Sequence, residues 1–400
     1  MSDKIRIGIL FGGRSGEHDV SLMSARSVIS VLSPERYEVT PIGITRDGIW
    51  VTSEEANAAE KVLTALAEGH IDGLTRVALL PEPEDDWLYA RRPADPKGEV
   101  QAAAPQRLEP LWPLEVVFPV MHGTFSEDGT MQGWLEITDL AYVGTGVLAS
   151  SVCMDKGLFK DVMREHDIPV LEWIIVTRDE IKNDLEKIVS QAEALAEYPL
   201  FVKPCNLGSS VGVTRCRGRS DLVEGLLEAA RYDRRIIVER GLNAREVEVS
   251  VLGNEVVEVS VAGEIVPSDD FYSYNAKYID DQSDLLIPAP IPEGVSLHIR
   301  DLAGRAFRAV DGAGMARVDF LLEKETLDVY LNEANTIPGF TRISMYPKLW
   351  EASGLPYPQL VDRLVELALE RKRERDGTER DFDGVFKRTM SQKKEGRDGA

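Results

Sequence analysis

Gly314-Met-Ala-Arg-Val-Asp-Phe-Leu-Leu322 is followed, after a short polar break, by Val329-Tyr-Leu-Asn-Glu-Ala-Asn335. Both stretches are rich in apolar and β-branched residues, with the alternation that is typical of strands. The break begins with Glu-Lys-Glu-Thr and is short enough for a hairpin turn. The two stretches therefore predict a β-hairpin, and the polar residues on it predict a site.

Four polar residues fall on matching faces of this hairpin. Arg317 and Asp319 are two residues apart on the first strand, as are Glu333 and Asn335 on the second, so each pair shares a face. An odd-with-odd register brings Asp319, Glu333 and Asn335 together. Two carboxylates and an amide oxygen suit Mg²⁺, and Arg317 suits a phosphoryl or carboxylate oxygen. The alternative is a solvated sheet face. The position of these residues at the ends of very apolar strands favours the metal site.

Bulk composition narrows the class of protein. The chain has 400 residues, enough for two or three domains, and a net charge of −22. This acidity argues against duplex nucleic acid or an anionic membrane as the main partner, although a local basic pocket can still hold ATP. The three cysteines show no CxxC spacing, and no apolar run reaches the ~18 residues of a membrane span. We expect a cytoplasmic protein with reduced thiols.

The first 150 residues predict a parallel sheet. A strand at 5–10, a glycine-rich turn, a helix at 20–32 and a strand at 37–44 form a βαβ pattern, with a tight hairpin at Asp47-Gly48. Residues 81–113 are rich in Pro, Asp and Glu and are expected to form a surface excursion. A strand at 116–120 leads into a polar loop at the carboxyl edge, where open α/β sheets bind ligands.

The rest of the chain predicts mixed α and β structure. A long polar segment at 269–284 has the character of a mobile lid, and the highly charged end of the chain is expected to be disordered. The expected strands lie at 171–177, 200–204, 211–215, 235–239, 245–251 and 255–261, and the expected helices at 179–197, 296–310 and from Pro356 to about Arg371.

The glycine-serine loop at 208–212 fits two incompatible chemistries. Its backbone N–H groups and hydroxyls could cradle phosphate. It also matches the G-x-S-x-G elbow of serine hydrolases, with Ser210 as nucleophile, and His298 is the only histidine after Ser210. An elbow needs a helix after the serine, whereas the residues after Ser210 are strand-like, which favours a flap over phosphates. A plain structural hairpin remains the simplest alternative.

Two charged residues are ambiguous on sequence alone. Lys203 ends an apolar strand, where it either binds phosphate oxygens or extends its ammonium group to solvent. Glu17 follows the first glycine-rich turn, where it either caps a helix or receives an ammonium group. Lys156, on an expected helix, carries no signal of its own.

Eight short motifs closely resemble those of one family in order and spacing. They are Gly12-Gly-Arg-Ser-Gly-Glu-His-Asp-Val-Ser21, His122-Gly with Glu127-Asp-Gly129, Met154-Asp-Lys156, Val202-Lys-Pro204, Gly208-Ser-Ser-Val-Gly212, Phe271-Tyr with Ala276-Lys-Tyr278, Arg317-Val-Asp319, and Asn332-Glu-Ala-Asn-Thr-Ile-Pro-Gly339. Together they resemble the D-alanine–D-alanine ligases of the ATP-grasp superfamily, from about residue 5 to residue 370. Each motif alone is weak, but the ordered set is very specific.

The resemblance implies a multi-domain α/β protein with an ATP-grasp fold and an N-terminal Rossmann-like parallel-sheet domain. The implied parts are an N-terminal substrate domain at 1–148, a central ATP-grasp subdomain at 149–235, a C-terminal subdomain with metal and substrate sites at 236–371, and a charged, disordered tail at 372–400. ATP is expected between the central and C-terminal subdomains.

The resemblance also implies the roles of individual residues. For the nucleotide, these are Lys156 and Lys203 on the phosphates, Ser209, Ser210 and Lys277 in the flexible loops around it, Glu239, Arg240 and Leu242 along the adenine edge, and Glu246 on the ribose. For the metals, they are Asp319, Glu333 and Asn335, binding two Mg²⁺ ions, with Mn²⁺ as an alternative. For the amino acids, they are Glu17 on the first ammonium group, His122 near the first substrate, Ser344 and Met345 near the second, Tyr278 linked to Ser209 and Glu17, and Arg317 with the Gly339 amide on the oxyanion.

The implied activity is ATP-dependent joining of two D-alanine molecules for peptidoglycan precursor synthesis. A carboxylate is a poor electrophile, so ATP first phosphorylates it, and the amine of the second amino acid then attacks the acyl phosphate. The implied partners are ATP, D-alanine and a second copy of the chain in a homodimer. The alternatives are a relative that uses D-lactate or D-serine as acceptor, a serine hydrolase acting through Ser210, and an inactive nucleotide-binding regulator.

Overall fold

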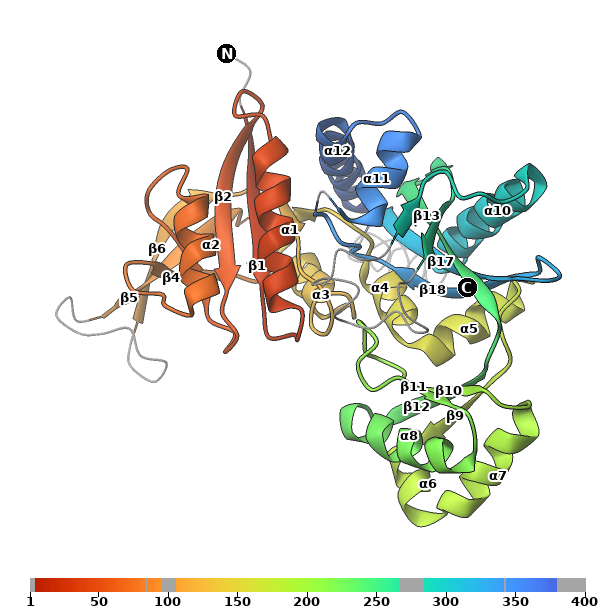
Figure 1. Ribbon diagram of the computed structural model, residues 1–400. Helices are drawn as coiled ribbons and strands as arrows, with labels where there is room; N and C mark the ends of the chain where they lie inside the picture. The colour runs from red at the N-terminus through yellow and green to blue at the C-terminus, as the bar shows by residue number, and fades with distance from the viewer. Residues whose placement is uncertain (1–3, 84, 95–105, 267–283, 342, 380–400) are drawn as a thin grey trace, which may run out of the picture.

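The computed structural model describes residues 4–83, 85–94, 106–266, 284–341 and 343–379. The chain forms three lobes, each built on its own β-sheet (Figure 1). The N-terminal lobe lies to one side, the C-terminal lobe lies beside it, and the central lobe extends away from the junction. Among the described residues, none of the helices is both long and apolar enough to cross a membrane. The three cysteines are free and buried.

The N-terminal lobe has an eight-stranded sheet with the order β6-β5-β4-β3-β2-β1-β7-β8. Strand β1 pairs in parallel with β2 and β7, and β7 with β8, so the predicted βαβ unit and the hairpin after β2 are confirmed. The elements of this lobe are β1 (Ile5–Gly12), α1 (His18–Val31), β2 (Tyr37–Ile44), β3 (Trp50–Thr52), α2 (Ala59–Glu68), β4 (Thr75–Leu79), β5 (Trp87–Pro93), β6 (Gln106–Pro113), β7 (Val116–Pro119), α3 (Thr130–Ile137) and β8 (Ala141–Tyr142).

The turn after β1 requires glycine. Gly12 has φ of +87°, and a Cβ there would lie 2.3 Å from the carbonyl oxygen of Ile44. The next residue, Gly13, donates its N–H to the same oxygen at 2.8 Å. This close approach ties the turn to β2 and sets where α1 begins, and with it the position of Glu17.

The excursion predicted for residues 81–113 is partly wrong. Strands β5 and β6 form an antiparallel hairpin that extends the edge of the N-terminal sheet. The high Pro and acidic content of this stretch suggested a loop, but Leu88 and Ala90 alternate with half-exposed neighbours and are fully buried. Pro113 is tolerated because it lies on the edge strand β6, and Pro93 because it is the last residue of β5, beyond the part of β5 that pairs with β4.

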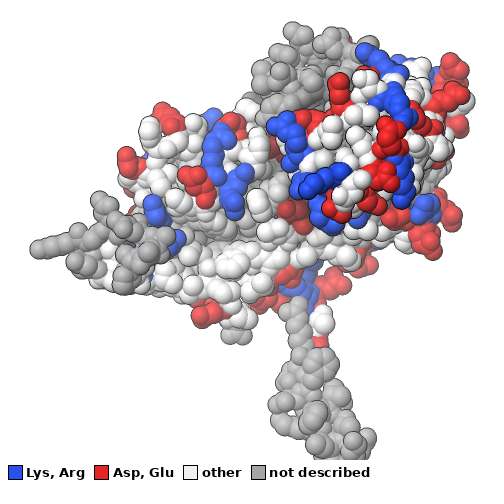
Figure 2. Space-filling model, turned by 90° about the horizontal axis from the view of Figure 1, so that it is seen from below, with Lys and Arg blue, Asp and Glu red and all other residues white. Residues whose placement is uncertain are grey.

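The central lobe is a four-stranded sheet with the order β11-β10-β12-β9. The single helix predicted at 179–197 is two helices, because Asp184 ends the first and accepts a hydrogen bond from Lys187 N–H at the start of the second. Charged side chains of both signs are interspersed over this lobe (Figure 2). The elements are β9 (Trp173–Thr177), α6 (Arg178–Asn183), α7 (Leu185–Leu195), β10 (Leu200–Pro204), β11 (Thr214–Cys216), α8 (Arg219–Tyr232) and β12 (Arg235–Arg240). Helices α4 (Val147–Met154) and α5 (Lys156–Glu165) precede them in the chain, and apolar residues of both helices belong to the core cluster of the C-terminal sheet.

The C-terminal lobe is built on a sheet with the order β16-β15-β13-β17-β18, with β14 paired to β13. The predicted hairpin is confirmed as the antiparallel pair of β17 and β18. The elements are β13 (Ala244–Gly253), β14 (Val257–Val259), β15 (Gly263–Val266), β16 (Asp284–Leu286), α10 (Glu293–Ala309), β17 (Gly314–Glu323), β18 (Val329–Asn335), α11 (Met345–Ala352) and α12 (Tyr357–Asp376). Helix α11 was not predicted, and α12 continues five residues past the predicted end at Arg371.

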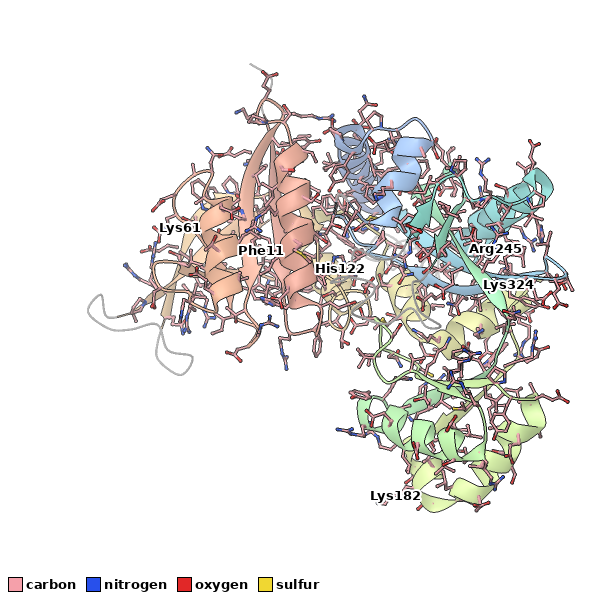
Figure 3. All side chains as sticks on the ribbon, viewed as in Figure 1. Phe11, Lys61, His122, Lys182, Arg245 and Lys324 are labelled. Carbon is pink, nitrogen blue, oxygen red and sulfur yellow. The ribbon has the colours of Figure 1, made fainter. Side chains whose placement is uncertain are left out.

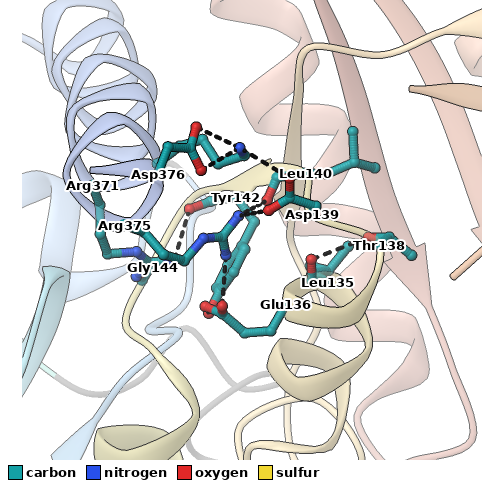
Figure 4. Close-up of polar contacts among 11 residues, drawn as sticks. Leu135, Glu136, Thr138, Asp139, Leu140, Tyr142, Gly144, Arg371, Arg375 and Asp376 are labelled. Atoms are coloured by element: carbon teal, nitrogen blue, oxygen red, sulfur yellow. Dashed lines mark hydrogen bonds and ion pairs between the residues drawn. The ribbon is translucent and has the colours of Figure 1, made fainter. Parts of the chain in front are cut away.

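Helix α12 fastens the C-terminal lobe to the N-terminal sheet. Arg371 stacks on the Tyr142 ring, with its guanidinium carbon 4.1 Å from the ring centroid. One turn later, Arg375 pairs with Glu136 at 2.6 Å and with Asp139 at 3.0 Å (Figure 4). Apolar residues of α12, such as Leu364, belong to the same core cluster as those of β1 and α1. The last turns of α12 therefore help to fix the two lobes that enclose the site.

We expect Arg375→Ala to lower the free energy of unfolding by about 2 kcal/mol, the scale for losing hydrogen bonds to charged groups. The variant leaves Glu136 and Asp139 without their guanidinium. Urea unfolding at pH 7 measures the change. Arg373→Ala is the matched control, because Arg373 lies exposed on the same helix. Equal stability of the two variants would show that the Arg375 contacts do not hold the lobes together.

Candidate active site

A cavity of about 890 Å³ lies where the three lobes meet. His122 lies on the side of the N-terminal lobe that faces the other two lobes (Figure 3). The walls of the cavity come from all three lobes and contain most of the residues singled out from sequence. Those in the walls are Glu17, His122, Lys156, Ser209, Arg317, Glu333, Asn335, Gly339, Ser344 and Met345.

The hairpin places its polar residues as predicted. Asp319 is the register partner of Glu333, and Arg317 is the partner of Asn335. Arg317 donates two hydrogen bonds to the two oxygens of Asp319, at 2.8 and 2.7 Å, and Asn335 Nδ2 donates to Asp319 at 2.9 Å. A β-bulge follows directly after Asp319. The bulge ends the odd-with-odd register, so only the ends of the two strands bring these groups together.

Arg317 joins two carboxylates. Besides Asp319, it pairs with Glu248 of β13, whose oxygen lies 3.0 Å from Arg317 Nε. Glu248 is the register partner of Asp319 on the other side of β17. Burial lowers the pKa of Arg317, but Asp319 and Glu248 together raise it well above its ordinary value. The guanidinium therefore stays charged and neutralises an otherwise acidic patch.

The oxygen-bearing side chains of the hairpin are of the chemical type that binds a hard divalent cation. The hairpin has two carboxylates, Asp319 and Glu333, and one amide, Asn335, which are oxygen ligands of the kind that Mg²⁺ takes. Within the described part of the chain, no three His, Cys, Asp or Glu side chains gather so as to hold a metal ion. Both oxygens of Asp319 accept from Arg317, so a cation at Asp319 would have to use a remaining lone pair of these oxygens or displace the guanidinium.

Lys156 lies in the cavity wall next to the hairpin. It is the first residue of α5, after Asp155, whose side chain accepts hydrogen bonds from the backbone of the first turn. Its Nζ donates to the carbonyl oxygen of Leu207 at 3.0 Å and lies 3.4 Å from Glu333. A lysine ammonium thus forms an ion pair with the acidic hairpin at the surface of the cavity.

Lys203 is paired within the protein and does not extend to solvent. Its Nζ lies 2.5 Å from Glu239, the other oxygen of which lies 2.9 Å from Lys160 of α5. Burial alone would raise the pKa of Glu239, but the two lysines hold it well below its ordinary value. The partner of Lys203 is thus a carboxylate, which the sequence argument did not consider.

The remaining residues expected around the nucleotide lie near this pair. Glu239 and Arg240 end β12, Leu242 lies in the connection to β13, and Glu246 lies on β13. Burial lowers the pKa of Lys203, but Glu239, and after it Glu333 and Glu246, raise it above its ordinary value. Arg240 is tied to Glu172 at 2.5 Å and lies over the Tyr330 ring. Arg240 is therefore held in place by neighbouring side chains. Arg240, Leu242 and Glu246 are all half-buried.

The glycine-serine loop joins two antiparallel strands, β10 and β11. The hydrolase alternative is therefore wrong, because a nucleophile elbow places the serine between a strand and a helix. Ser209 and Ser210 have φ of 51° and 58°, a left-handed conformation that is uncommon outside glycine. This backbone carries the loop towards the N-terminal lobe, where Ser209 Oγ donates to Glu17.

Glu17 does not cap its helix through its side chain. It occupies the position before α1, but its carboxylate makes no capping hydrogen bond and instead accepts from Ser209. Gly123 is packed so closely that a Cβ there would lie 2.6 Å from Glu17 Oε2. Gly123 also donates its N–H to Glu127 at 2.6 Å. Burial, and then the nearby charge of Glu17, raise the pKa of Glu127 above its ordinary value of 4.5.

The raised pKa of Glu127 predicts a pH-dependent stability. Its contribution is fully present below about pH 4.5 and is lost as the pH rises through the value in the folded protein. Glu127→Gln carries no titrating proton, so we expect it to gain stability relative to the parent as the pH is raised. Urea unfolding from about pH 4.5 to about pH 9 measures this trend. Glu68→Gln, at the exposed end of α2, is the control, and a pH-independent difference for Glu127→Gln would contradict the assignment.

His122 is held by protein groups on both ring nitrogens. Its Nδ1 lies 3.0 Å from the carbonyl oxygen of Ile337, which can only accept, so Nδ1 carries the proton. Its Nε2 lies 3.0 Å from Ser24 Oγ, which also receives the Phe340 N–H at 3.4 Å. Burial lowers the pKa of His122 to about 4, so the ring is neutral. His122 therefore ties α1 to the segment after β18.

That segment carries Gly339 and leads to Ser344 and Met345. Gly339 has no room for a side chain, because a Cβ there would lie 2.8 Å from Ser344 Oγ. The Ser344 hydroxyl accepts the Thr341 N–H at 3.0 Å, which closes a tight turn before α11. Met345 is buried at the start of α11. Gly339, Ser344 and Met345 thus face the cavity from one wall.

Two expected site residues cannot be placed. Lys277 and Tyr278, together with the predicted lid at 269–284, lie almost wholly outside the described residues. Three further residues had no assigned role on sequence alone. Glu248 could have been found from the alternation on β13, where it shares a face with Glu246. Lys160 and Glu127 gave no comparable signal.

Comparisons with known proteins agree over most of the chain. A family model described as "D-ala D-ala ligase N-terminus" matches residues 6–145, and one described as "D-ala D-ala ligase C-terminus" matches residues 162–366. A D-alanine–D-alanine ligase of Heliobacterium modesticaldum is 46% identical over 379 residues, covering 94% of this chain and 98% of the relative. One from a Thermoanaerobacter species is 47% identical over 374 residues, covering 93% and 99%.

Solved structures show the same similarity. The D-alanine–D-alanine ligase of Coxiella burnetii superposes with a TM-score of 0.76 at 35% identity, covering 94% of this chain and 97% of that one. The VanG D-Ala:D-Ser ligase of Enterococcus faecalis superposes with a TM-score of 0.78 at 31% identity, covering 92% and 100%.

The ATP-grasp fold and the lysines facing a carboxylate-bearing hairpin define an ATP-dependent ligase. Enzymes of this class couple the release of ADP to the joining of a carboxylate and an amine. On the family models and the relatives together, the chain belongs to the D-alanine–D-alanine ligase family.

Proposed function

We propose that this enzyme joins two D-alanine molecules with ATP, forming D-alanyl-D-alanine for peptidoglycan precursors, with the residues around the cavity in the roles given below. One observation carries the proposal. The cavity brings a carboxylate that can hold an amine, Glu17, together with an ammonium group, Lys156, that faces an acidic hairpin. The Glu17 carboxylate would attract the ammonium group of an amino acid, and the Lys156 ammonium group would attract a nucleotide phosphate.

The order of events follows from the chemistry of a carboxylate. The first D-alanine binds with its ammonium group at Glu17, so its carboxylate points towards the phosphates held by Lys156 and Lys203. A carboxylate oxygen attacks the terminal phosphoryl group, and ADP leaves. The amine of the second D-alanine then attacks the acyl carbon of the D-alanyl phosphate. Arg317 and the Gly339 N–H stabilise the negative charge on the tetrahedral oxygen, and phosphate leaves.

The metal ligands in this proposal are Asp319, Glu333 and Asn335, which would hold two Mg²⁺ ions. When bound, these ions neutralise charge on the transferring phosphoryl group. A cation held by Asp319 would weaken the contact of Arg317 with that carboxylate, which would leave the guanidinium available to the oxyanion. The Arg317 guanidinium offsets the charge of Asp319 and Glu248 before the substrates bind. This ion pair is compatible with Asp319 as a metal ligand and with Arg317 as an oxyanion donor.

The acceptor is D-alanine in this proposal, and D-serine or D-lactate is the second candidate. The second candidate is considered because the chain is similar to a D-Ala:D-Ser ligase structure. The curated relatives at 46–47% identity, however, are D-alanine–D-alanine ligases. Dependence on ATP and three free, buried cysteines support a cytoplasmic location. A homodimer remains a prediction from the family resemblance.

An assay of phosphate release tests the proposed function. Purified enzyme with Mg-ATP is offered D-alanine, D-serine, D-lactate and L-alanine, singly and in pairs, and the products are separated by chromatography. We expect D-alanine alone to trigger release of ADP and phosphate with formation of the dipeptide. The absence of ADP and phosphate release with every one of these compounds would refute the proposal, and a preferred mixed product would replace it with the second candidate.

A further inference from the structure

Lys160 is a fully buried lysine that the proposed chemistry does not use. It lies on α5, one turn after Lys156, and is only 1% exposed. Lysine is almost never fully buried unless it is paired, because its ammonium group loses its hydration. The partner of Lys160 is the carboxylate of Glu239, and the Lys160 Nζ also lies 5.7 Å from the centroid of the Trp173 ring.

Glu239 lies between two lysines of different exposure. One carboxylate oxygen lies 2.9 Å from Lys160 and the other lies 2.5 Å from Lys203. The side-chain exposure is 1% for Lys160 and 4% for Glu239, but 16% for Lys203. Lys160 is therefore inaccessible to solvent, whereas Lys203 is partly exposed and is the lysine that a ligand can reach.

Two ammonium groups flank the single carboxylate of Glu239, and the more exposed one, on Lys203, also feels the charges of Glu333 and Glu246. The Lys203 ammonium is the group that would attract an anion such as a nucleotide phosphate. If Lys203 turns towards that phosphate, Glu239 loses one partner while it remains buried. A buried carboxylate without a counter-ion is strongly unfavourable. Lys160 can supply that counter-ion without moving, because its Nζ already lies 2.9 Å from the second oxygen of Glu239.

We propose that Lys160 is a positioning residue that keeps Glu239 ionised and fixed while Lys203 moves to the nucleotide, and that it thereby sets the preference for a purine base with an exocyclic amino group. The inference rests on the proposed function, in which Glu239 lies along the base. The oxygen that Lys203 leaves is free to accept an N–H. An ionised carboxylate can only accept, so it rejects a base with a carbonyl at that position.

The test compares ATP with ITP, which differ in this group of the base. Lys160→Met removes the charge at similar length, and Lys160→Arg keeps it. For Lys160→Met we expect the KM for ATP to rise at least tenfold with a smaller change in kcat, and the ATP-to-ITP ratio of kcat/KM to fall at least tenfold. Lys160→Arg is expected to recover part of that ratio. Lys182→Met is the control, since Lys182 lies exposed on α6 at the far end of the central lobe (Figure 3).

A binding measurement separates this inference from the proposed function. Calorimetry with ADP and IDP needs no amino acid, so it reports base preference even if D-alanine is not a substrate. A folded Lys160→Met that keeps the parent's ADP-to-IDP ratio would overturn the inference. If Lys160→Met does not fold, the double variant Lys160→Met/Glu239→Gln removes both buried charges. We expect the double variant to bind IDP about as well as ADP, and retention of the parent's preference would again overturn the inference.

Discussion

Arg317→Ala is expected to lower kcat by about 100- to 1,000-fold, or about 3–4 kcal/mol, the scale for removing one oxyanion donor. Arg317 is the guanidinium that faces the cavity from β17, and its own neighbours, Asp319 and Glu248, keep it charged. The alanine variant lacks the charge-assisted hydrogen bond that Arg317 is proposed to donate in the transition state, while the lysines proposed to hold ATP remain. The affinity for ATP should therefore change much less than kcat.

This variant also removes the counter-ion of the buried Glu248 and the half-buried Asp319, so stability has to be measured beside activity. Breaking a buried ion pair from one side commonly destabilises by about 3–5 kcal/mol. Arg317→Lys serves as the matched variant, because it keeps the charge and loses the two-pronged contact with Asp319. We expect it to be more stable than Arg317→Ala but still slow. A folded Arg317→Ala with the parent's kcat would refute the oxyanion role.

Asp319→Asn is expected to raise the Mg²⁺ concentration needed for half-maximal activity by about 100-fold or more. Even outer-shell partners of a metal account for about 10–100-fold in affinity, so loss of a charged ligand should exceed that range. The change conserves shape, and the asparagine oxygen can still accept from Asn335. Arg317 keeps Glu248 as its partner, so we expect the fold to survive.

Binding of Mn²⁺ with a non-hydrolysable ATP analogue, followed by calorimetry, gives a readout that does not depend on turnover. Asp301→Asn is the control, because Asp301 lies exposed on α10 of the same lobe. An unchanged metal affinity in folded Asp319→Asn would show that the hairpin does not hold the ions. The proposed Mg²⁺ site would then need other ligands.

The hairpin and the parallel sheet were predictable because short-range patterns specify them. Alternation of apolar and polar residues predicted β17 and β18, and an odd-with-odd register placed Asp319, Glu333 and Asn335 on one face. The β-bulge after Asp319 did not disturb that prediction, since it lies beyond the polar residues. Strands β5 and β6 were missed because their proline and acidic content outweighed a weak alternation that only burial reveals.

The sequence could not reveal contacts between distant segments. Lys160 and Glu239 are far apart in the chain, and Lys160 on a helix has the pattern of an ordinary charged residue. The two nitrogens of His122 are likewise satisfied by Ser24 and Ile337, which are far apart in the sequence. Charge pairing across lobes depends on tertiary packing, which neither propensity nor spacing encodes.

Transfer of an isotope tests the central claim most directly, namely that the cavity activates a carboxylate by phosphorylation. D-alanine labelled with ¹⁸O in its carboxylate is incubated with the enzyme and Mg-ATP, and the released phosphate is analysed by mass spectrometry. The oxygen that attacks the phosphoryl group leaves with phosphate, so we expect one labelled oxygen in each phosphate released per dipeptide formed. Unlabelled phosphate, with dipeptide still accumulating, would contradict an acyl phosphate intermediate.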